Sequence, residues 1–297
     1  MSQVARYGLK YAIELISNIR DFADSLGRIS SNQQIPRYLA AKRFYASSAM
    51  GLSGLMFYDM AVGDKKVPRE RKLVGRTASG VVLLTVVVDG IVDRGTMSLE
   101  EKFKFLDGVK SDLFGYSSNT SENFGEEASY VLARAVYSDL LSRDRDRKVE
   151  KIFDELVEVI KRQFSEKNHE ELLRIAKTTG ACCAESTAVL TEIVRGEEYP
   201  KIRESARRMG EYCELLDHWY ELDDDLAEGA NTYPTVRIRQ ERDCPALRRE
   251  IRRELLVHAD ESVLAGFNCL STLEQRGIYR TLKTMIDFKY KVAGRLH

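Results

Sequence analysis

The chain has 297 residues, 43% hydrophobic and 31% charged, which is enough for one large domain with a sizeable core. Lysine plus arginine equals aspartate plus glutamate at 46 each, and this neutral balance argues against a general nucleic-acid-binding protein. The five cysteines lack zinc-finger spacing, and we find neither a signal peptide nor an apolar run of about 18 residues. We therefore predict a single cytoplasmic domain over residues 1–297, with no membrane span.

Apolar periodicity predicts helices from the start of the chain, first over residues 1–26 and then over residues 37–60. Residues 69–93 end in the run VVLLTVVVDGIVD, which has two readings. Its β-branched residues favour a strand, and Asp-Gly favours a hairpin turn. We predict a fully buried helix instead, because a lone hairpin is marginally stable and the chain offers no clear partner strands.

Ser98 and Glu101 have the spacing of a capping box, which predicts a helix start at residue 98. Residues 108–125 resemble a loop. Further helices are predicted at residues 126–142, 147–165, 168–194, 245–262 and 263–292, and Gly180 is expected to bend or break the third of these. The acidic stretch 209–235 is predicted to be helical to about Glu228, with Pro234 as the stop. The predicted fold is an all-α single-domain helical bundle around a central apolar cavity.

The acidic stretch places Asp217, Glu221 and Asp225 at i, i+4 and i+8, in one stripe along a helix. Neighbouring carboxylates in such a stripe repel by about 3 kcal/mol at an effective dielectric of 20. The stripe is therefore stable facing water or facing a cation, and periodicity does not separate these two cases. We interpret it as a magnesium site that holds a diphosphate, with Asp224 as an alternative to Asp225.

Asp89 and Asp93 form a second acidic pair, which follows the apolar residues 81–88. Carboxylates at the end of a buried helix must be neutral, paired or metal-bound. The alternative is a solvated hairpin tip. If both acidic groups face each other, they would bind several Mg²⁺ ions that also use water and phosphate oxygens as ligands.

Basic and hydroxyl side chains would complete such a diphosphate site, although each is also an ordinary surface or core residue in a chain with 46 basic residues. The candidates are Arg76, Arg174, Lys289 and Tyr290. Aromatic residues that fit either a cavity wall or an ordinary core are Phe44, Tyr45, Phe57, Tyr58 and Trp219. Glu166 and His169 have the ExxH spacing of di-iron bundles, but the required second copy is missing.

These motifs resemble those of known enzymes. Asp89-Gly-Ile-Val-Asp93 resembles the DDIVD-type first acidic motif of squalene and phytoene synthases. The spacing Gly210-x-x-x-Glu214-x-x-Asp217-x-x-x-Glu221-x-x-x-Asp225 resembles their second acidic motif, and its last three residues have the spacing of the metal-binding triad of class I terpene synthases. The following GANTYP is similar to a Gly-x-x-Tyr-x-Pro segment of the first group. Gly90, Asp217 and Glu221 depart from the family residues.

The resemblance implies an isoprenoid synthase of the class I type, a lyase or transferase that uses three Mg²⁺ ions to ionise an allylic prenyl diphosphate. Asp89, Asp93, Asp217, Glu221 and Asp225 would hold metal. Arg174, Lys289 and Tyr290 would contact the diphosphate. A terpene cyclase is the preferred activity; the alternatives are a head-to-head condensing enzyme and a non-catalytic interaction protein. The fold also implies a homodimer and peripheral membrane contact for a lipid product.

Overall fold

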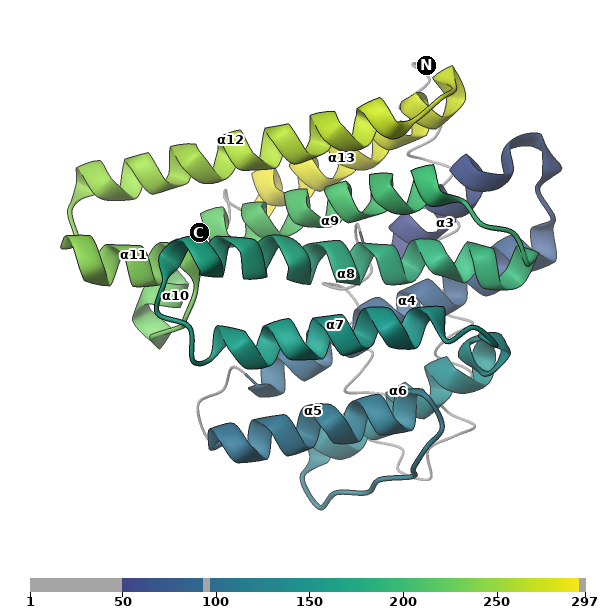
Figure 1. The fold of residues 1–297 in the computed structure, drawn as a ribbon, viewed down its shortest axis with the longest axis horizontal. Helices are drawn as coiled ribbons and strands as arrows, with labels where there is room; N and C mark the ends of the chain where they lie inside the picture. Colours follow the sequence, from purple (N-terminus) through teal and green to yellow (C-terminus); the bar gives the residue numbers. More distant parts are fainter. Residues whose placement is uncertain (1–49, 93–96, 294–297) are drawn as a thin grey trace.

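The computed structural model describes residues 50–92 and 97–293, and every regular element in those ranges is a helix (Figure 1). The helices predicted over residues 1–26 and at residues 37–49 lie outside the described residues, as does Asp93. The α-helices are α3 (Met50–Val62), α4 (Pro68–Val92), α5 (Leu99–Leu113), α6 (Phe124–Asp139), α7 (Lys148–Gln163), α8 (His169–Arg195), α9 (Pro200–Tyr220), α10 (Leu222–Glu228), α11 (Tyr233–Glu241), α12 (Pro245–Cys269) and α13 (Leu273–Ala293).

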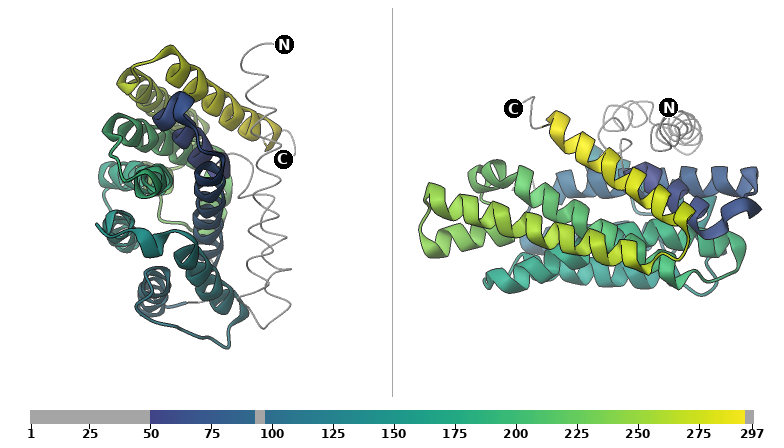
Figure 2. Two further views of the ribbon diagram at one scale, coloured as in Figure 1. Left: turned by 90° about the vertical axis from the view of Figure 1, so that its right-hand side faces the viewer. Right: turned by 90° about the horizontal axis from the view of Figure 1, so that it is seen from above.

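The helices lie side by side in a slab, with α12 and α13 along one edge and α5 and α6 along the other (Figures 1 and 2). Helices α8 and α9 occupy the middle, and their buried side chains belong to one hydrophobic cluster that extends through the described helices. The prediction of an all-α bundle is confirmed. The predicted single domain over residues 1–297 extends beyond the described residues and stays a prediction.

The ambiguous apolar run is helical, since α4 continues through it to Val92. The helix is buried because its valines and leucines pack inside the bundle. By length and composition α4 could also cross a membrane, but 69% of its apolar window is buried among the other helices. This degree of burial is typical of a helix in the core of a helical bundle.

The amino-terminal end of α5 confirms the predicted capping box. Ser98 Oγ accepts a hydrogen bond from the Glu101 amide at 3.3 Å, and Glu101 Oε2 accepts one from the Ser98 amide at 2.7 Å. The predicted loop start at residue 108 is wrong, because α5 continues to Leu113. Phe105, Val109 and Leu113 are buried at helical spacing, and this apolar face outweighs the helix-weakening effect of Gly108.

Helix α8 is continuous, so the predicted break at Gly180 is wrong. The glycine instead allows α8 and α9 to approach closely. A Cβ atom added to Gly180 would lie 2.3 Å from the Gly210 carbonyl oxygen, and one added to Gly210 would lie 1.9 Å from the Gly180 carbonyl oxygen. Both distances are far below van der Waals contact, so this crossing requires glycine on both helices.

Three helix boundaries in the carboxy-terminal third differ from the prediction. The acidic helix ends at Tyr220 and resumes at Leu222, with a bend at Glu221 between them. Pro234 does not stop a helix but lies in the first turn of α11, where its fixed backbone angle and missing N–H are tolerated. Helix α12 passes the predicted boundary at residues 262–263 and ends where Leu270 adopts an extended backbone conformation.

Candidate active site

The acidic stripe continues across the bend between α9 and α10. The Glu221 amide donates to the Asp217 carbonyl and the Asp225 amide donates to the Glu221 carbonyl, each at 2.8 Å. These i to i+4 bonds keep the helical register, so the three side chains still follow one another along one face. Asp217 and Asp225 are half-buried and Glu221 is exposed.

Tyr290 of α13 orients the Asp217 carboxylate. Its hydroxyl donates a hydrogen bond to Asp217 Oδ1 and lies 3.3 Å from the carbonyl oxygen of Cys213. Burial, together with the nearby negative charge of Asp217, raises the pKa of Tyr290 well above its usual value, so the hydroxyl remains a donor. The Tyr290 ring stacks on that of Tyr220, with ring centroids 4.9 Å apart.

Asp225 is anchored by the segment GANTYP that follows it. Thr232 Oγ1 donates to Asp225 Oδ2 at 3.2 Å, and the Ala230 amide donates to the Asp225 carbonyl oxygen at 2.9 Å. From the sequence, this segment is predicted only as a helix stop that resembles a family motif, and Thr232 has no predicted role. The sequence signal that could have revealed the role of Thr232 is a threonine directly before Tyr-Pro, which is typical of a helix start. Helix α11, which was not predicted, begins there. Thr232 and Thr235 form a capping box there.

The neighbouring acids have other structural roles. Asp223 forms ion pairs with Arg248 at 2.7 Å and with Arg252 at 2.9 Å, so it ties α10 to α12. Asp224 is exposed. The i+4 residue Asp225 is therefore a better candidate than Asp224 for the third position of the stripe, as its spacing predicts.

The last turn of α4 lies at the same end of the bundle as Asp217. Glu70 near the start of α4 forms an ion pair with Arg195 at the end of α8 (3.0 Å), and Val82 farther along α4 lines one cavity with Thr187 of α8, so the two helices run antiparallel. Helix α9 follows α8 after a short connection and also runs back along it. The last turn of α4, which carries Asp89, is thus level with the acidic end of α9. The side chains of Asp89 and Lys289 lie outside what the structure describes.

Arg174 belongs to the first half of α8, which lies at this acidic end. Its side chain is 71% exposed and forms an ion pair with Glu171 at 2.8 Å. In this conformation the guanidinium extends into solvent. Its expected contact with a diphosphate stays a prediction.

An apolar cavity of about 20 Å³ lies deeper in the bundle than the acids. Cys213 lies one helical turn below Asp217 on α9, and Ile286 lies one turn below Tyr290 on α13; both line the cavity. The complete lining is Ser53, Phe57, Val82, Cys183, Ala184, Thr187, Met209, Gly210, Cys213, Leu282 and Ile286. Phe57 is thus a cavity-wall residue as well as a core residue, whereas Trp219 packs near the acidic end.

The carboxylates fit magnesium through the chemistry of their oxygen donors. In the described part of the chain, no three His, Cys, Asp or Glu side chains are already gathered for a metal ion. Mg²⁺ in proteins usually keeps several waters and uses one or two carboxylates plus substrate phosphates rather than an all-protein cage. The di-iron alternative has no support, since Glu166 accepts from the backbone amides of Lys167 and Asn168 while His169 contacts Gln240.

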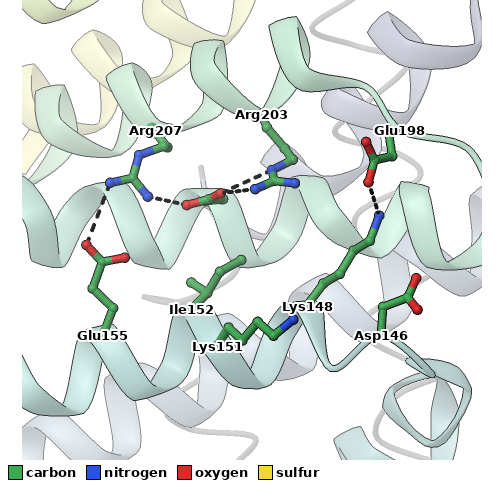
Figure 3. A pocket seen from close by; sticks show the side chains of 9 residues that line it. Asp146, Lys148, Lys151, Ile152, Glu155, Glu198, Arg203 and Arg207 are labelled. Carbon is green, nitrogen blue, oxygen red and sulfur yellow. Dashed lines mark hydrogen bonds and ion pairs between the residues drawn. The ribbon is translucent and has the colours of Figure 1, made fainter.

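A larger, charged pocket of about 650 Å³ lies between α7, α8 and α9, away from the acidic stripe (Figure 3). Its basic side chains face acidic ones. The buried Glu185 accepts hydrogen bonds from Arg203 at 3.1 Å and from Arg207, while Lys148 pairs with Glu198 at 3.1 Å. Since these charges are matched within the pocket, we interpret the network as a link between the helices.

Comparisons with known proteins support the fold. No protein-family model and no curated protein sequence matches the chain. Geranylgeranyl pyrophosphate synthetase from Geoglobus acetivorans superposes with a TM-score of 0.62 at 12% identity, covering 94% of this chain and 99% of its own.

Two further structures extend the comparison. Geranylgeranyl pyrophosphate synthase from Corynebacterium glutamicum, complexed with isoprenyl diphosphate and magnesium, has a TM-score of 0.62 and 14% identity, with 92% and 97% covered. Linalool/nerolidol synthase from Streptomyces clavuligerus has a TM-score of 0.59 and 12% identity, with 96% and 98% covered. The chain therefore has the all-α isoprenoid synthase fold.

Proposed function

We propose that this protein is a Mg²⁺-dependent class I terpene synthase that ionises an allylic prenyl diphosphate and cyclises the resulting carbocation. The proposal rests chiefly on one observation. A carboxylate oriented by a buried tyrosine, Asp217 with Tyr290, lies one helical turn above an apolar cavity in an isoprenoid synthase fold. The known proteins of this fold described above include a terpene synthase and a synthase complexed with isoprenyl diphosphate and magnesium.

The positions of the acidic residues suggest two groups of metal ligands. Asp217, Glu221 and Asp225 would bind metal from α9 and α10, and Asp89 and Asp93 would do so from the end of α4. Bound Mg²⁺ would neutralise the leaving diphosphate and so assist cleavage of the carbon–oxygen bond.

The chain's own contribution is to orient these groups and to keep bulk water away. Tyr290 fixes the direction of Asp217, and Thr232 does the same for Asp225. The prenyl tail would enter the apolar region below the acids, where side chains such as Phe57 and Val82 would have to move to make room. Exclusion of bulk water there would protect the carbocation.

A head-to-head condensing enzyme is the second candidate. The Gly210-to-Asp217 spacing and the segment GANTYP resemble squalene and phytoene synthases. Several proteins of this fold are chain-elongating synthases, but we find no counterpart in the sequence of their lysine and arginine motif for the homoallylic substrate. Both candidate enzymes use an allylic prenyl diphosphate. The assay must therefore distinguish a reaction of one prenyl substrate from a reaction that joins two.

The test is to incubate the protein with prenyl diphosphates of C10 to C25 and Mg²⁺, with and without a homoallylic diphosphate, and to measure released diphosphate and organic products. A cyclic or rearranged product from one substrate supports the cyclase. A product of doubled length supports condensation, and an elongated diphosphate supports chain elongation. No turnover at any chain length would favour a non-catalytic interaction protein.

We expect Asp89→Ala and Glu221→Ala each to abolish turnover, because each would remove a metal ligand, while the helical circular dichroism signal is retained. Asp224→Ala is the matched control, since Asp224 lies on the same short helix as Asp225 and is exposed. It should keep most of the activity. Full activity in Asp89→Ala or Glu221→Ala would show that the residue is not a ligand.

A further inference from the structure

Two hydroxyl groups line the otherwise apolar cavity. Ser53 of α3 and Thr187 of α8 have their oxygens 3.3 Å apart, and their exposed fractions are 6% and 1%. Both side chains belong to the cavity wall, together with the thiols of Cys183 and Cys213. A buried polar pair in such a wall costs free energy unless its hydrogen bonds are satisfied.

The geometry of Thr187 leaves its oxygen as an acceptor. Its hydroxyl donates to the carbonyl oxygen of Ala184 at 2.8 Å, so the single hydrogen of this group is already used. The lone pairs of Thr187 Oγ1 then accept from Ser53 or from a further donor at the cavity surface. A donor that meets this hydroxyl pair from the cavity side would direct its hydrogens toward the wall.

The cavity is large enough for one small donor of this kind. A volume of about 20 Å³ matches one water molecule, which needs at least about 10–15 Å³ and two to four polar partners. Apart from the thiols of Cys183 and Cys213, which form only weak hydrogen bonds, the remaining wall is formed by apolar side chains such as Phe57, Val82 and Leu282. A water held by Ser53 and Thr187 would keep a lone pair directed away from these two hydroxyls, toward a prenyl tail admitted when side chains such as Phe57 and Val82 move.

We propose that Ser53 and Thr187 hold one water molecule in the apolar cavity, and that this water captures the carbocation so that the product is a terpene alcohol. The inference rests on the proposed function. The carbon–oxygen bond to the diphosphate breaks, and the water oxygen forms a new bond to the cationic carbon. The water then loses one proton to the released diphosphate. The sum is a prenyl diphosphate plus water giving an alcohol plus diphosphate.

The test uses the prenyl diphosphate that gives the fastest diphosphate release, with the reaction run in ¹⁸O-labelled water. The wild-type alcohol should carry ¹⁸O, because a contaminating phosphatase that cleaves the phosphorus–oxygen bond would leave the substrate oxygen in place. Thr187→Val keeps the side-chain shape and removes the hydroxyl. We expect the share of alcohol among the products to fall about tenfold, the effect of losing one good hydrogen bond. The alcohol share is measured relative to total product, so this readout does not depend on the overall rate of diphosphate release.

Ser186→Ala is the matched control, because Ser186 is also buried on α8 but donates to the Cys183 carbonyl and does not line the cavity. It should leave the alcohol share unchanged, and Thr187→Ser should restore it if Thr187→Val folds poorly. Diphosphate release with only hydrocarbon products in the wild type would overturn this inference and leave the proposed function standing. An unchanged alcohol share in both Thr187→Val and Ser53→Ala would also overturn it. No diphosphate release from any substrate would overturn the proposed function, and this inference with it.

Discussion

At the scale of single residues, the contact between Tyr290 and Asp217 links the core to the candidate site. Replacing Tyr290 by phenylalanine removes only the hydroxyl that orients this carboxylate. Loss of an outer-shell partner of this kind typically lowers metal affinity or activity by about 10- to 100-fold. We expect kcat/KM to fall within that range and the Mg²⁺ concentration for half-maximal rate to rise.

Tyr220→Phe is the matched control for this variant. Tyr220 stacks on Tyr290, but no hydrogen bond of its hydroxyl is seen among the described residues. Its kcat/KM should stay within about threefold of the wild type, since only packing contacts remain relevant. Equal losses in the two variants would show that the aromatic stack matters and the hydroxyl does not.

Gly90 is a second position where a single substitution tests the proposed metal site. It lies in α4 beside Asp89, and a Cβ atom added there would meet nothing within 4 Å. Gly90→Asp should therefore fold normally and supply the carboxylate that DDIVD-type motifs carry at this position. We expect half-saturation at a lower Mg²⁺ concentration, by about threefold or more, because Mg²⁺ prefers carboxylate ligands. Gly90→Ala controls for the helix itself, and tighter metal binding in both variants would contradict the role of the added carboxylate.

At the scale of helices, the crossing of α8 and α9 depends on Gly180 and Gly210. Gly180→Ala would force a methyl group against a backbone carbonyl at 2.3 Å, so the helices must separate. We expect the free energy of unfolding in urea to fall by about 1–3 kcal/mol or more, as for other overpacked cores. Gly277→Ala on α13 is the control, because no atom lies within 4 Å of its Cβ position. It should be neutral or stabilising by up to about 1 kcal/mol. If the free energy of unfolding fell by a similar amount in both variants, the close approach of α8 and α9 would not explain the need for Gly180.

Local patterns in the sequence predicted some helices well and others poorly, for physical reasons. The start of α5 was predictable because its cap needs only Ser98 and Glu101, which are close in sequence. The burial of the second half of α4 was predictable because the run at residues 81–88 is hydrophobic on all sides of the helix. The role of Gly180 was not, because it depends on Gly210, which is far away in the chain. Helix α11 was missed because Pro234 stops one helix and starts another equally well.

The candidate site was predictable in part. The spacing of Asp217, Glu221 and Asp225 on one face follows from the helical repeat alone. Periodicity left open whether that face meets water or a cation. The question depends on the antiparallel order of α4, α8 and α9, which puts the last turn of α4 at the same end of the bundle as the acidic end of α9. Tyr290 as the partner of Asp217 likewise required coordinates, since a last-helix tyrosine is usually an ordinary core residue.

At the scale of the whole molecule, charged side chains gather in two separate regions: the acidic stripe, where we expect diphosphate to bind through metal, and the charge-matched pocket between α7, α8 and α9, where we do not (Figure 3). The chain has one tryptophan, Trp219, which lies two positions from both Asp217 and Glu221. The Trp219 ring packs edge-on against the Tyr220 ring, with the ring centroids 4.5 Å apart. The Arg252 guanidinium carbon lies 5.9 Å from the centroid of the Trp219 ring. Its fluorescence therefore reports on the acidic end without requiring turnover.

We expect inorganic diphosphate to change the Trp219 emission only when Mg²⁺ is present, and EDTA to reverse the change, because carboxylates repel the anion unless metal lies between them. Asp217→Asn should weaken this response at least tenfold, since it removes a ligand charge. Lys151→Ala is the control at the charged pocket, where Lys151 is exposed and lines the wall. A response that needs no Mg²⁺, or that Lys151→Ala removes and Asp217→Asn leaves intact, would place the anion in the charged pocket. The acids of α9 and α10 would then be a solvated face of the bundle.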